Sequence, residues 1–170
     1  MSEPRHLPHL RHLPHLRHLR HLPHVPRHLV IADPDPRERE RATVLIQAIA
    51  PELGDIVVHP ASDGREALAL IETHHPALVV CEVLLAGISG LALLRRLRRV
   101  RASTTPMPRH PPPHFILVTS MARESDRYWG LRNGAHGYVM KPYEDDLLQA
   151  RVREVLVAGD DALPEKLASL

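Results

Sequence analysis

Leu78-Val79-Val80-Cys81-Glu82-Val83 is a run of apolar residues that a single acid interrupts. A strand with this little alternation of polar and apolar residues is typical of a parallel sheet whose two faces are both covered. Four similar runs lie before and after it, at residues 29–33, 56–59, 115–119 and 137–140, and helical patterns separate them. The sequence therefore predicts an α/β fold, a doubly wound five-stranded parallel sheet with five helices.

Two of the predicted helices begin with a capping signature. Asp35-Pro36-Arg37-Glu38 and Asp63-Gly64-Arg65-Glu66 each place an aspartate at the N-cap and a glutamate three residues later, which predicts a capping box. Pro51 and Gly54 are expected to end the first of these helices. Further helices are predicted after Gly90 and at residues 123–132 and 145–157.

Four polar side chains lie at or just beyond the carboxyl ends of predicted strands. They are Asp33, Glu82, Thr119 and Lys141. Ligands bind at this edge of an open parallel sheet, so we expect the four side chains to converge there in a functional site.

The N-terminal segment differs in composition from the rest of the chain. The chain carries 22 basic and 20 acidic residues, yet residues 1–28 contain five arginines and one acid, so the remainder is mildly acidic. Histidine recurs every third residue from His6 to His24, among prolines that prevent a continuous helix. We expect residues 1–27 to form a disordered low-complexity tail, with metal binding or attachment to an acidic partner as open alternatives. Residues 28–158 are the expected domain, and residues 159–170 a short C-terminal tail.

The cysteine content and the hydropathy of the sequence indicate in which cellular compartment the protein is expected. Cys81 is the only cysteine, so an intramolecular disulfide is excluded, and its apolar neighbours predict a buried thiol. No apolar run reaches the length of about 18 residues that a membrane-spanning helix needs, and the N-terminus lacks the apolar core of a secretory signal. We expect a cytoplasmic protein with no membrane association.

Two longer blocks carry a family resemblance, residues 76–90 around Glu82 and residues 133–143 around Lys141. From about Leu29 to Ala158 the chain resembles the receiver domains of two-component response regulators. The resemblance implies the flavodoxin-like strand order 2-1-3-4-5. It also implies roles for single residues: Asp33 as the first acid of the pocket, and Thr119, Lys141 and Tyr138 as the hydroxyl, cation and aromatic residue of the switch.

The chain departs from the family pattern at two positions. Pro34 stands where the second, metal-binding acid is expected, and Glu82 stands where the phosphate-accepting aspartate is expected. Proline offers no side-chain oxygen to Mg²⁺, and glutamate places its carboxylate about one methylene too far forward for in-line attack. Asp35 could replace the missing acid, although capping already gives it a structural role. We therefore predict a pseudo-receiver, not an enzyme, with no cofactor and with weak or absent Mg²⁺ binding.

The expected function is stand-alone, phosphorylation-independent signalling by protein–protein contact. Glu82 is expected to reach Lys141 and mimic a phosphoryl group; an inert pocket in which the two residues only stabilise each other is the alternative. A working phosphorelay response regulator with a degenerate site and a His-rich metal-binding protein are the other candidates. In this family the usual partner surface is the fourth predicted helix, fifth strand and fifth helix, at residues 123–132, 137–140 and 145–157. A homodimer is a further possibility. We expect no DNA-binding domain, because too few residues follow the last predicted helix.

Overall fold

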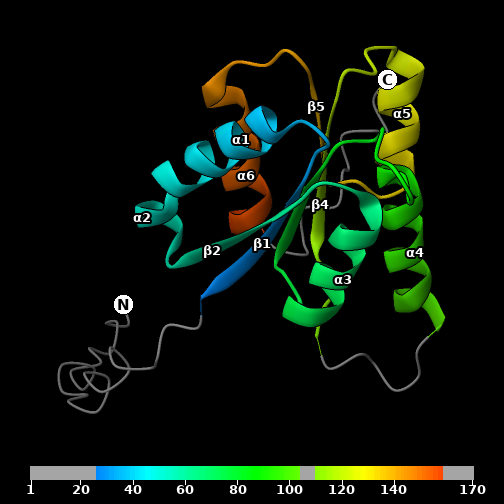
Figure 1. The fold of residues 1–170 in the computed structure, drawn as a ribbon, viewed down its shortest axis with the longest axis horizontal. Helices are drawn as coiled ribbons and strands as arrows, with labels where there is room; N and C mark the ends of the chain where they lie inside the picture. Colours follow the sequence, from blue (N-terminus) through cyan, green and yellow to red (C-terminus); the bar gives the residue numbers. More distant parts are fainter. Residues whose placement is uncertain (1–25, 104–109, 159–170) are drawn as a thin grey trace, which may run out of the picture.

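The computed structural model describes residues 26–103 and 110–158. Five strands alternate with helices along this part of the chain (Figure 1). In chain order the elements are β1 (Arg27–Ala32), α1 (Pro36–Ala48), α2 (Ala50–Leu53), β2 (Ile56–Ala61), α3 (Gly64–His74), β3 (Leu78–Cys81), α4 (Gly90–Ser103), β4 (His114–Thr119), α5 (Glu124–Arg132), β5 (Gly137–Met140) and α6 (Asp145–Ala158).

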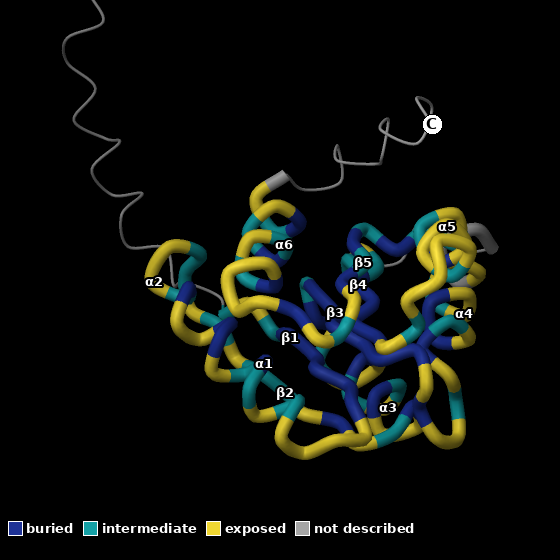
Figure 2. The backbone as a smooth tube through the Cα atoms, turned by 90° about the horizontal axis from the view of Figure 1, so that it is seen from above, coloured by how far each residue is buried: buried dark blue, intermediate teal, exposed yellow. Residues whose placement is uncertain are grey.

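The strands form one parallel sheet in the order β2-β1-β3-β4-β5, which confirms the predicted doubly wound, flavodoxin-like topology. Helices α1, α2 and α6 lie on one side of the sheet, and α3, α4 and α5 lie on the other (Figure 1). The strands are the most deeply buried part of the molecule, between helices whose outer surfaces are exposed (Figure 2). Each face of the sheet therefore contributes to its own hydrophobic core.

Alternation along β1 shows how the sequence supplies both cores. Leu29 and Ile31 pack into the cluster that faces α1 and α6, whereas Val30 and Ala32 pack into the cluster that faces α3 and α4. Successive side chains of a strand point to opposite faces, so a strand between two helical layers must be apolar at every position. This requirement explains the unbroken apolar runs of the sequence.

The described residues form six helices where five were predicted. Helix α1 ends at Ala48, and a separate four-residue helix, α2, lies between it and Gly54. Pro51 has no amide hydrogen to donate to the carbonyl of Gln47, so the first helix cannot continue through it. The Ile49 amide instead donates to Ile46 in a tightened last turn.

Neither predicted capping box forms as expected. Asp35 and Asp63 cap their helices, but the Asp35 amide donates to Asp33 Oδ1 rather than to Glu38. The Glu66 carboxylate accepts from the amide and hydroxyl of Ser62, one residue before the cap. In each helix the aspartate alone satisfies the first free amides.

Strand boundaries also differ from the prediction. β3 ends at Cys81 rather than Val83, because the amides of Val83 and Leu84 donate to the Glu82 side chain instead of a neighbouring strand. β2 continues beyond His59 to Ala61 and includes Pro60, which an edge strand tolerates. β1 already begins at Arg27, whose amide bonds to the carbonyl of Asp55.

The two predicted terminal tails lie almost entirely outside the residues that the structure describes. The proposed tails at residues 1–27 and 159–170 lie, apart from Pro26 and Arg27, beyond the described residues. Within the described residues, no helix combines the length and apolarity that crossing a membrane requires.

Candidate functional site at the carboxyl edge of the sheet

The four polar residues predicted to converge lie at one edge of the sheet. Asp33 comes directly after β1, Glu82 directly after β3 and Lys141 directly after β5, while Thr119 ends β4, and these four strands are neighbours. Asp33 and Glu82 are each 5% exposed, and Thr119 is fully buried. Among the described residues these three are the only buried polar or charged ones, so the buried polar groups gather in this one place.

Lys141 joins the two acids of the site. Its Nζ atom donates to Asp33 Oδ2 and lies 3.0 Å from Glu82 Oε2. The contact between Glu82 and Lys141 that the sequence suggested is therefore present. Two buried carboxylates share one ammonium group, an arrangement in which removal of the cation would leave uncompensated charge.

The second carboxylate oxygen of Glu82 is held by the backbone. Oε1 accepts from the amide of Val83 at 2.7 Å and from the amide of Leu84 at 3.1 Å. The hydroxyl of Thr119 lies beside the carboxylate and helps to lower its pKa. An ammonium, a hydroxyl and two amides thus surround one carboxylate, which makes this position a strong site for negative charge.

Gly90 allows the loop after β3 to close around Glu82. Its amide donates to the Val83 carbonyl at 3.0 Å, and a Cβ atom at this position would lie only 2.4 Å from the Glu82 carbonyl oxygen. Any larger residue would push the loop away from the site. The glycine therefore supports the turn that aims the two backbone amides at the carboxylate.

The electrostatics of the site favour the charged forms of the pair. Burial alone acts to raise the pKa of Glu82, but hydrogen bonds from Thr119, the Leu84 amide and Lys141 lower it overall. Burial acts to lower the pKa of Lys141, and its bonds to Asp33 and Glu82 raise it overall. Both groups are therefore ionised at neutral pH. In contrast, burial, Glu82 and Asp33 raise the pKa of the Cys81 thiol, which makes it inert, as expected.

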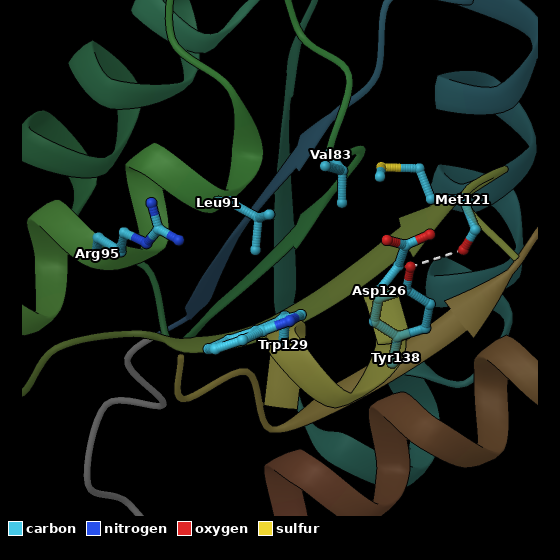
Figure 3. A pocket seen from close by; sticks show the side chains of 7 residues that line it. All are labelled: Val83, Leu91, Arg95, Met121, Asp126, Trp129 and Tyr138. Atoms are coloured by element: carbon cyan, nitrogen blue, oxygen red, sulfur yellow. Dashed lines mark hydrogen bonds between the residues drawn. The ribbon is translucent and has the colours of Figure 1, made fainter. Parts of the chain in front are cut away.

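A chain of hydrogen bonds runs from Thr119, which lies beside Glu82, to Tyr138. Thr119 accepts at Oγ1 from the Met121 amide at 3.2 Å. The Met121 carbonyl accepts from the Tyr138 hydroxyl at 2.7 Å (Figure 3). The pKa of Tyr138 rises to about 12, mainly through burial and further through Asp126 and Glu82. The Tyr138 hydroxyl is thereby connected through Met121 to Thr119, the residue beside the carboxylate.

Tyr138 borders a cavity between α4 and α5. The cavity has a volume of about 360 Å³, and Figure 3 shows its lining: Val83, Leu91, Arg95, Met121, Asp126, Trp129 and Tyr138. Gly130 of α5 packs directly on the tyrosine ring, since a Cβ atom there would lie 3.0 Å from Tyr138 Cδ2. The hydrogen-bonded chain from Thr119 therefore ends at the wall of a mainly apolar cavity.

The structure separates the two acids that the sequence placed in the pocket. Asp33 is buried and bonded to Lys141, whereas Asp35 is exposed and its Oδ1 caps α1 by accepting from the Arg37 amide at 2.9 Å. Asp35 is thus a capping residue here and not a pocket acid. Pro34 between them is exposed, and the Arg39 guanidinium donates to the carbonyls of Asp33 and Pro34 at 2.6 and 3.1 Å.

The carboxylate oxygens at this edge of the sheet do not fit a Mg²⁺ ion. The ion prefers several carboxylate or water oxygens in near-octahedral geometry. At this edge Asp33 Oδ1 accepts from the Asp35 amide, Asp33 Oδ2 pairs with Lys141, and both Glu82 oxygens are engaged. The Lys141 ammonium already pairs with both acids, and the Arg39 guanidinium binds the backbone carbonyl of Asp33.

Some groups of the site were not predicted from the sequence. The amides of Val83 and Leu84 and the backbone of Met121 complete the network around Glu82 and Tyr138. Every residue except proline has an amide, so no sequence signal distinguishes these three. Only the fold aims them at the site.

Residues 29–153 match the family described as response regulator receiver domain. This chain belongs to that family. The match covers all four residues of the buried polar site and reaches into all five strands. The matched domain is therefore a signalling module of the two-component type rather than a classical enzyme.

Several curated relatives of this receiver domain are longer than the segment that matches. The transcriptional regulatory protein AfsQ1 of Streptomyces coelicolor is 37% identical over 103 residues, which cover 61% of this chain and 41% of that protein. The probable transcriptional regulator ycf27 of Porphyridium aerugineum is 35% identical over 60% of this chain and 38% of its own length. Protein PilH of Pseudomonas aeruginosa is 27% identical over 75% of this chain and 96% of its own length.

Solved structures show the same fold. A putative response regulator from Chloroflexus aurantiacus is 29% identical with a TM-score of 0.64, over 78% of this chain and 99% of that one. The BeF3-activated DrrB receiver domain is 24% identical with a TM-score of 0.63, over the same shares of the two chains.

Proposed function

We propose that this receiver domain signals through protein contact without being phosphorylated, as a pseudo-receiver in which Glu82 replaces the phosphoryl group. The observation that carries the proposal is the set of bonds to the Glu82 carboxylate. Lys141 and the amides of Val83 and Leu84 bind it, and the Thr119 hydroxyl lies beside it. The Glu82 carboxylate thus already occupies the position at which the surrounding hydrogen-bond donors would stabilise a phosphoryl group.

The chemistry of phosphoryl transfer supports the same conclusion. Attack on a phosphoryl donor needs a free carboxylate oxygen in line with the leaving group and a cation that neutralises the phosphoryl oxygens. Both oxygens of Glu82 are bound, and Pro34 supplies no metal ligand. A misplacement of about 1 Å costs on the order of a hundredfold in rate. Acceptor and metal ligand are therefore both missing at this site, and we propose that Mg²⁺ binds weakly or not at all.

The permanent negative charge of Glu82 acts on the two switch residues, Thr119 and Tyr138. In receiver domains the hydroxyl residue and the aromatic residue respond to the acceptor, and here Met121 joins Tyr138 to Thr119, which lies beside Glu82. The Glu82 carboxylate keeps Thr119 turned toward the acceptor position, and Thr119 in turn keeps Tyr138 at the wall of the cavity. This arrangement corresponds to a receiver held in one signalling state.

The partner surface is suggested by exposed apolar residues. The three elements of the surface expected from the sequence are α5, β5 and α6 in the structure, and each exposes at least one large apolar side chain, among them Trp129, Met140 and Leu147. Exposed apolar residues on neighbouring elements mark a surface for protein contact. We propose that a signalling partner, or a second copy of the chain, binds there.

Incubation with acetyl phosphate and Mg²⁺, followed by intact-mass measurement, tests the proposal. The wild-type chain and the Glu82→Asp variant are expected to gain no phosphoryl group, because Pro34 still denies the metal a ligand. The double variant Pro34→Asp/Glu82→Asp serves as the positive control, since it restores the acceptor and the acid beside Asp33. A phosphorylated wild-type chain would instead favour the alternative function, a working phosphorelay response regulator.

A further inference from the structure

Three histidines from different elements meet at the end of the sheet opposite to Glu82. His28 lies near the start of β1, His59 lies in β2, and His74 is the last residue of α3. The register pairs His28 with Val57 and Val30 with His59, so both strand histidines project to the face that α3 covers. Helix α3 runs back along this face, and its C-terminal turn therefore brings His74 to them (Figure 1).

The three imidazole rings lie in direct contact. The rings of His59 and His74 stack with centroids 3.8 Å apart, and the His28 ring lies 5.1 and 5.5 Å from theirs. A hydrogen bond of 2.9 Å joins His28 Nδ1 and His59 Nε2. All three side chains are half-buried, so the group is partly shielded but open on one side.

We propose that His28, His59 and His74 form a binding site for a divalent transition-metal ion, with Zn²⁺ as the fitting ion. One ring nitrogen of each residue lies within 4.8 Å of the other two. Tetrahedral Zn²⁺ with bonds of about 2.0–2.1 Å requires ligand nitrogens about 3.3 Å apart. The His28–His59 pair must therefore open slightly, and the widest pair must close by about 1.5 Å at most. The His59 and His74 rings, stacked at 14°, must also rotate about their side-chain bonds so that the ion lies in both ring planes.

The surroundings suit a metal with nitrogen ligands. Three imidazole ligands select Zn²⁺, Cu²⁺ or Ni²⁺ over Mg²⁺ and Ca²⁺, which prefer oxygen. Within the described part of the chain, His74 makes ring contacts but no hydrogen bond through its nitrogens, so these atoms are available as ligands. Three protein ligands leave a fourth position for water or another ligand.

A metal here would join β1, β2 and α3. The three ligands come together only in the folded domain, so an ion bound by them stabilises the folded state over the unfolded state. The repeat at residues 6–24 also contains histidines, but they are close in sequence and need no folded domain to bind zinc. Stabilisation of the fold by zinc therefore distinguishes the three-histidine site from the repeat.

Thermal unfolding of the full chain with and without Zn²⁺ tests the assignment. At Zn²⁺ about a hundredfold above the dissociation constant, we expect the wild-type Tm to rise by on the order of 5–10 °C. His28→Gln, His59→Gln and His74→Gln should each lose most of this rise. His75→Asn is the matched control, because it removes the adjacent histidine at a left-handed position that asparagine tolerates, and it should keep the rise. The assignment is overturned if the wild type shows no rise, if the three variants keep it, or if the control loses it.

Imidazole NMR of the wild-type chain provides a second test that needs no variant to fold. One equivalent of Zn²⁺ beyond the amount that the repeat binds should shift the ring nitrogens of His28, His59 and His74 together. Unchanged signals for these rings at saturating zinc would exclude the site.

Discussion

Lys141 Nζ lies 3.0 Å from Glu82 Oε2, and both side chains are largely withdrawn from solvent. The same ammonium also binds Asp33, so one cation balances two buried carboxylates. This relationship ties the stability of the site to its proposed signalling state. It also means that changes at any of the three residues will not be independent.

A double-mutant cycle should detect strong coupling between Glu82 and Lys141. Lys141→Met leaves two buried carboxylates without a cation, and we expect a loss of about 3–5 kcal/mol in the free energy of unfolding. Glu82→Gln should cost less, because Asp33 still balances Lys141, and the double variant should cost less than the sum of the two. Urea unfolding of the four proteins measures the cycle. Glu52→Gln, which breaks the exposed pair with Arg153, is the control and should have a much smaller effect. Additive losses would show that the contact contributes no coupling.

Stability should have a broad plateau that ends at both acidic and alkaline pH. The folded-state pKa of Glu82 lies below its usual value, so its contribution is complete above the unfolded-state pKa of 4.5 and is lost as pH falls through the folded-state pKa. The folded-state pKa of Lys141 lies above 10.5, so its contribution is complete below 10.5 and is lost as pH rises through the folded value. Urea midpoints measured across pH for the wild type and Glu82→Gln test this. The variant should lack the part of the acid dependence that belongs to Glu82, and identical acid limbs would contradict the assignment.

Tyr138→Phe should loosen the link between Glu82 and the cavity without unfolding the domain. The variant loses the 2.7 Å bond to the Met121 carbonyl, which corresponds to about 0.5–1.5 kcal/mol of stability. NMR should show shifts at the amides of Met121 and Thr119. Tyr128→Phe is the control, since the exposed Tyr128 hydroxyl hydrogen-bonds only to Arg132 among the described residues. Equal effects of the two variants on Thr119 would argue against a specific link.

The sequence predicted the parts of the fold that depend on hydrophobic pattern. All five strands and the meeting of Asp33, Glu82, Thr119 and Lys141 result from apolar runs that end in polar residues, because parallel strands share one carboxyl edge. Pro51 was recognised as the end of a helix, but the short helix α2 that contains it was not predicted. A proline marks where a helix stops, whereas a single turn such as α2 is too short to show a hydrophobic period.

Features that depend on tertiary approach could not be predicted. The Val83 and Leu84 amides bind Glu82 only because the Gly90 turn closes the loop, and the capping box at Asp35 fails because Asp33 takes its amide. The three histidines of the proposed metal site are up to 46 positions apart, from His28 to His74, and no periodic pattern connects them. The regular repeat at residues 6–24 was the more visible histidine signal.

The central claim, that Glu82 occupies the anion site and prevents phosphorylation chemistry, is tested most directly by NMR with beryllofluoride and Mg²⁺. Beryllofluoride imitates a phosphoryl group on an acceptor carboxylate, so it requires a free acceptor and a metal ligand. We predict that the amide signals of Val83, Leu84 and Thr119 stay unchanged when both reagents are added to the wild type. Saturable, magnesium-dependent shifts centred on Asp33, Glu82 and Thr119 would contradict the claim and show a receiver that still accepts a phosphoryl group.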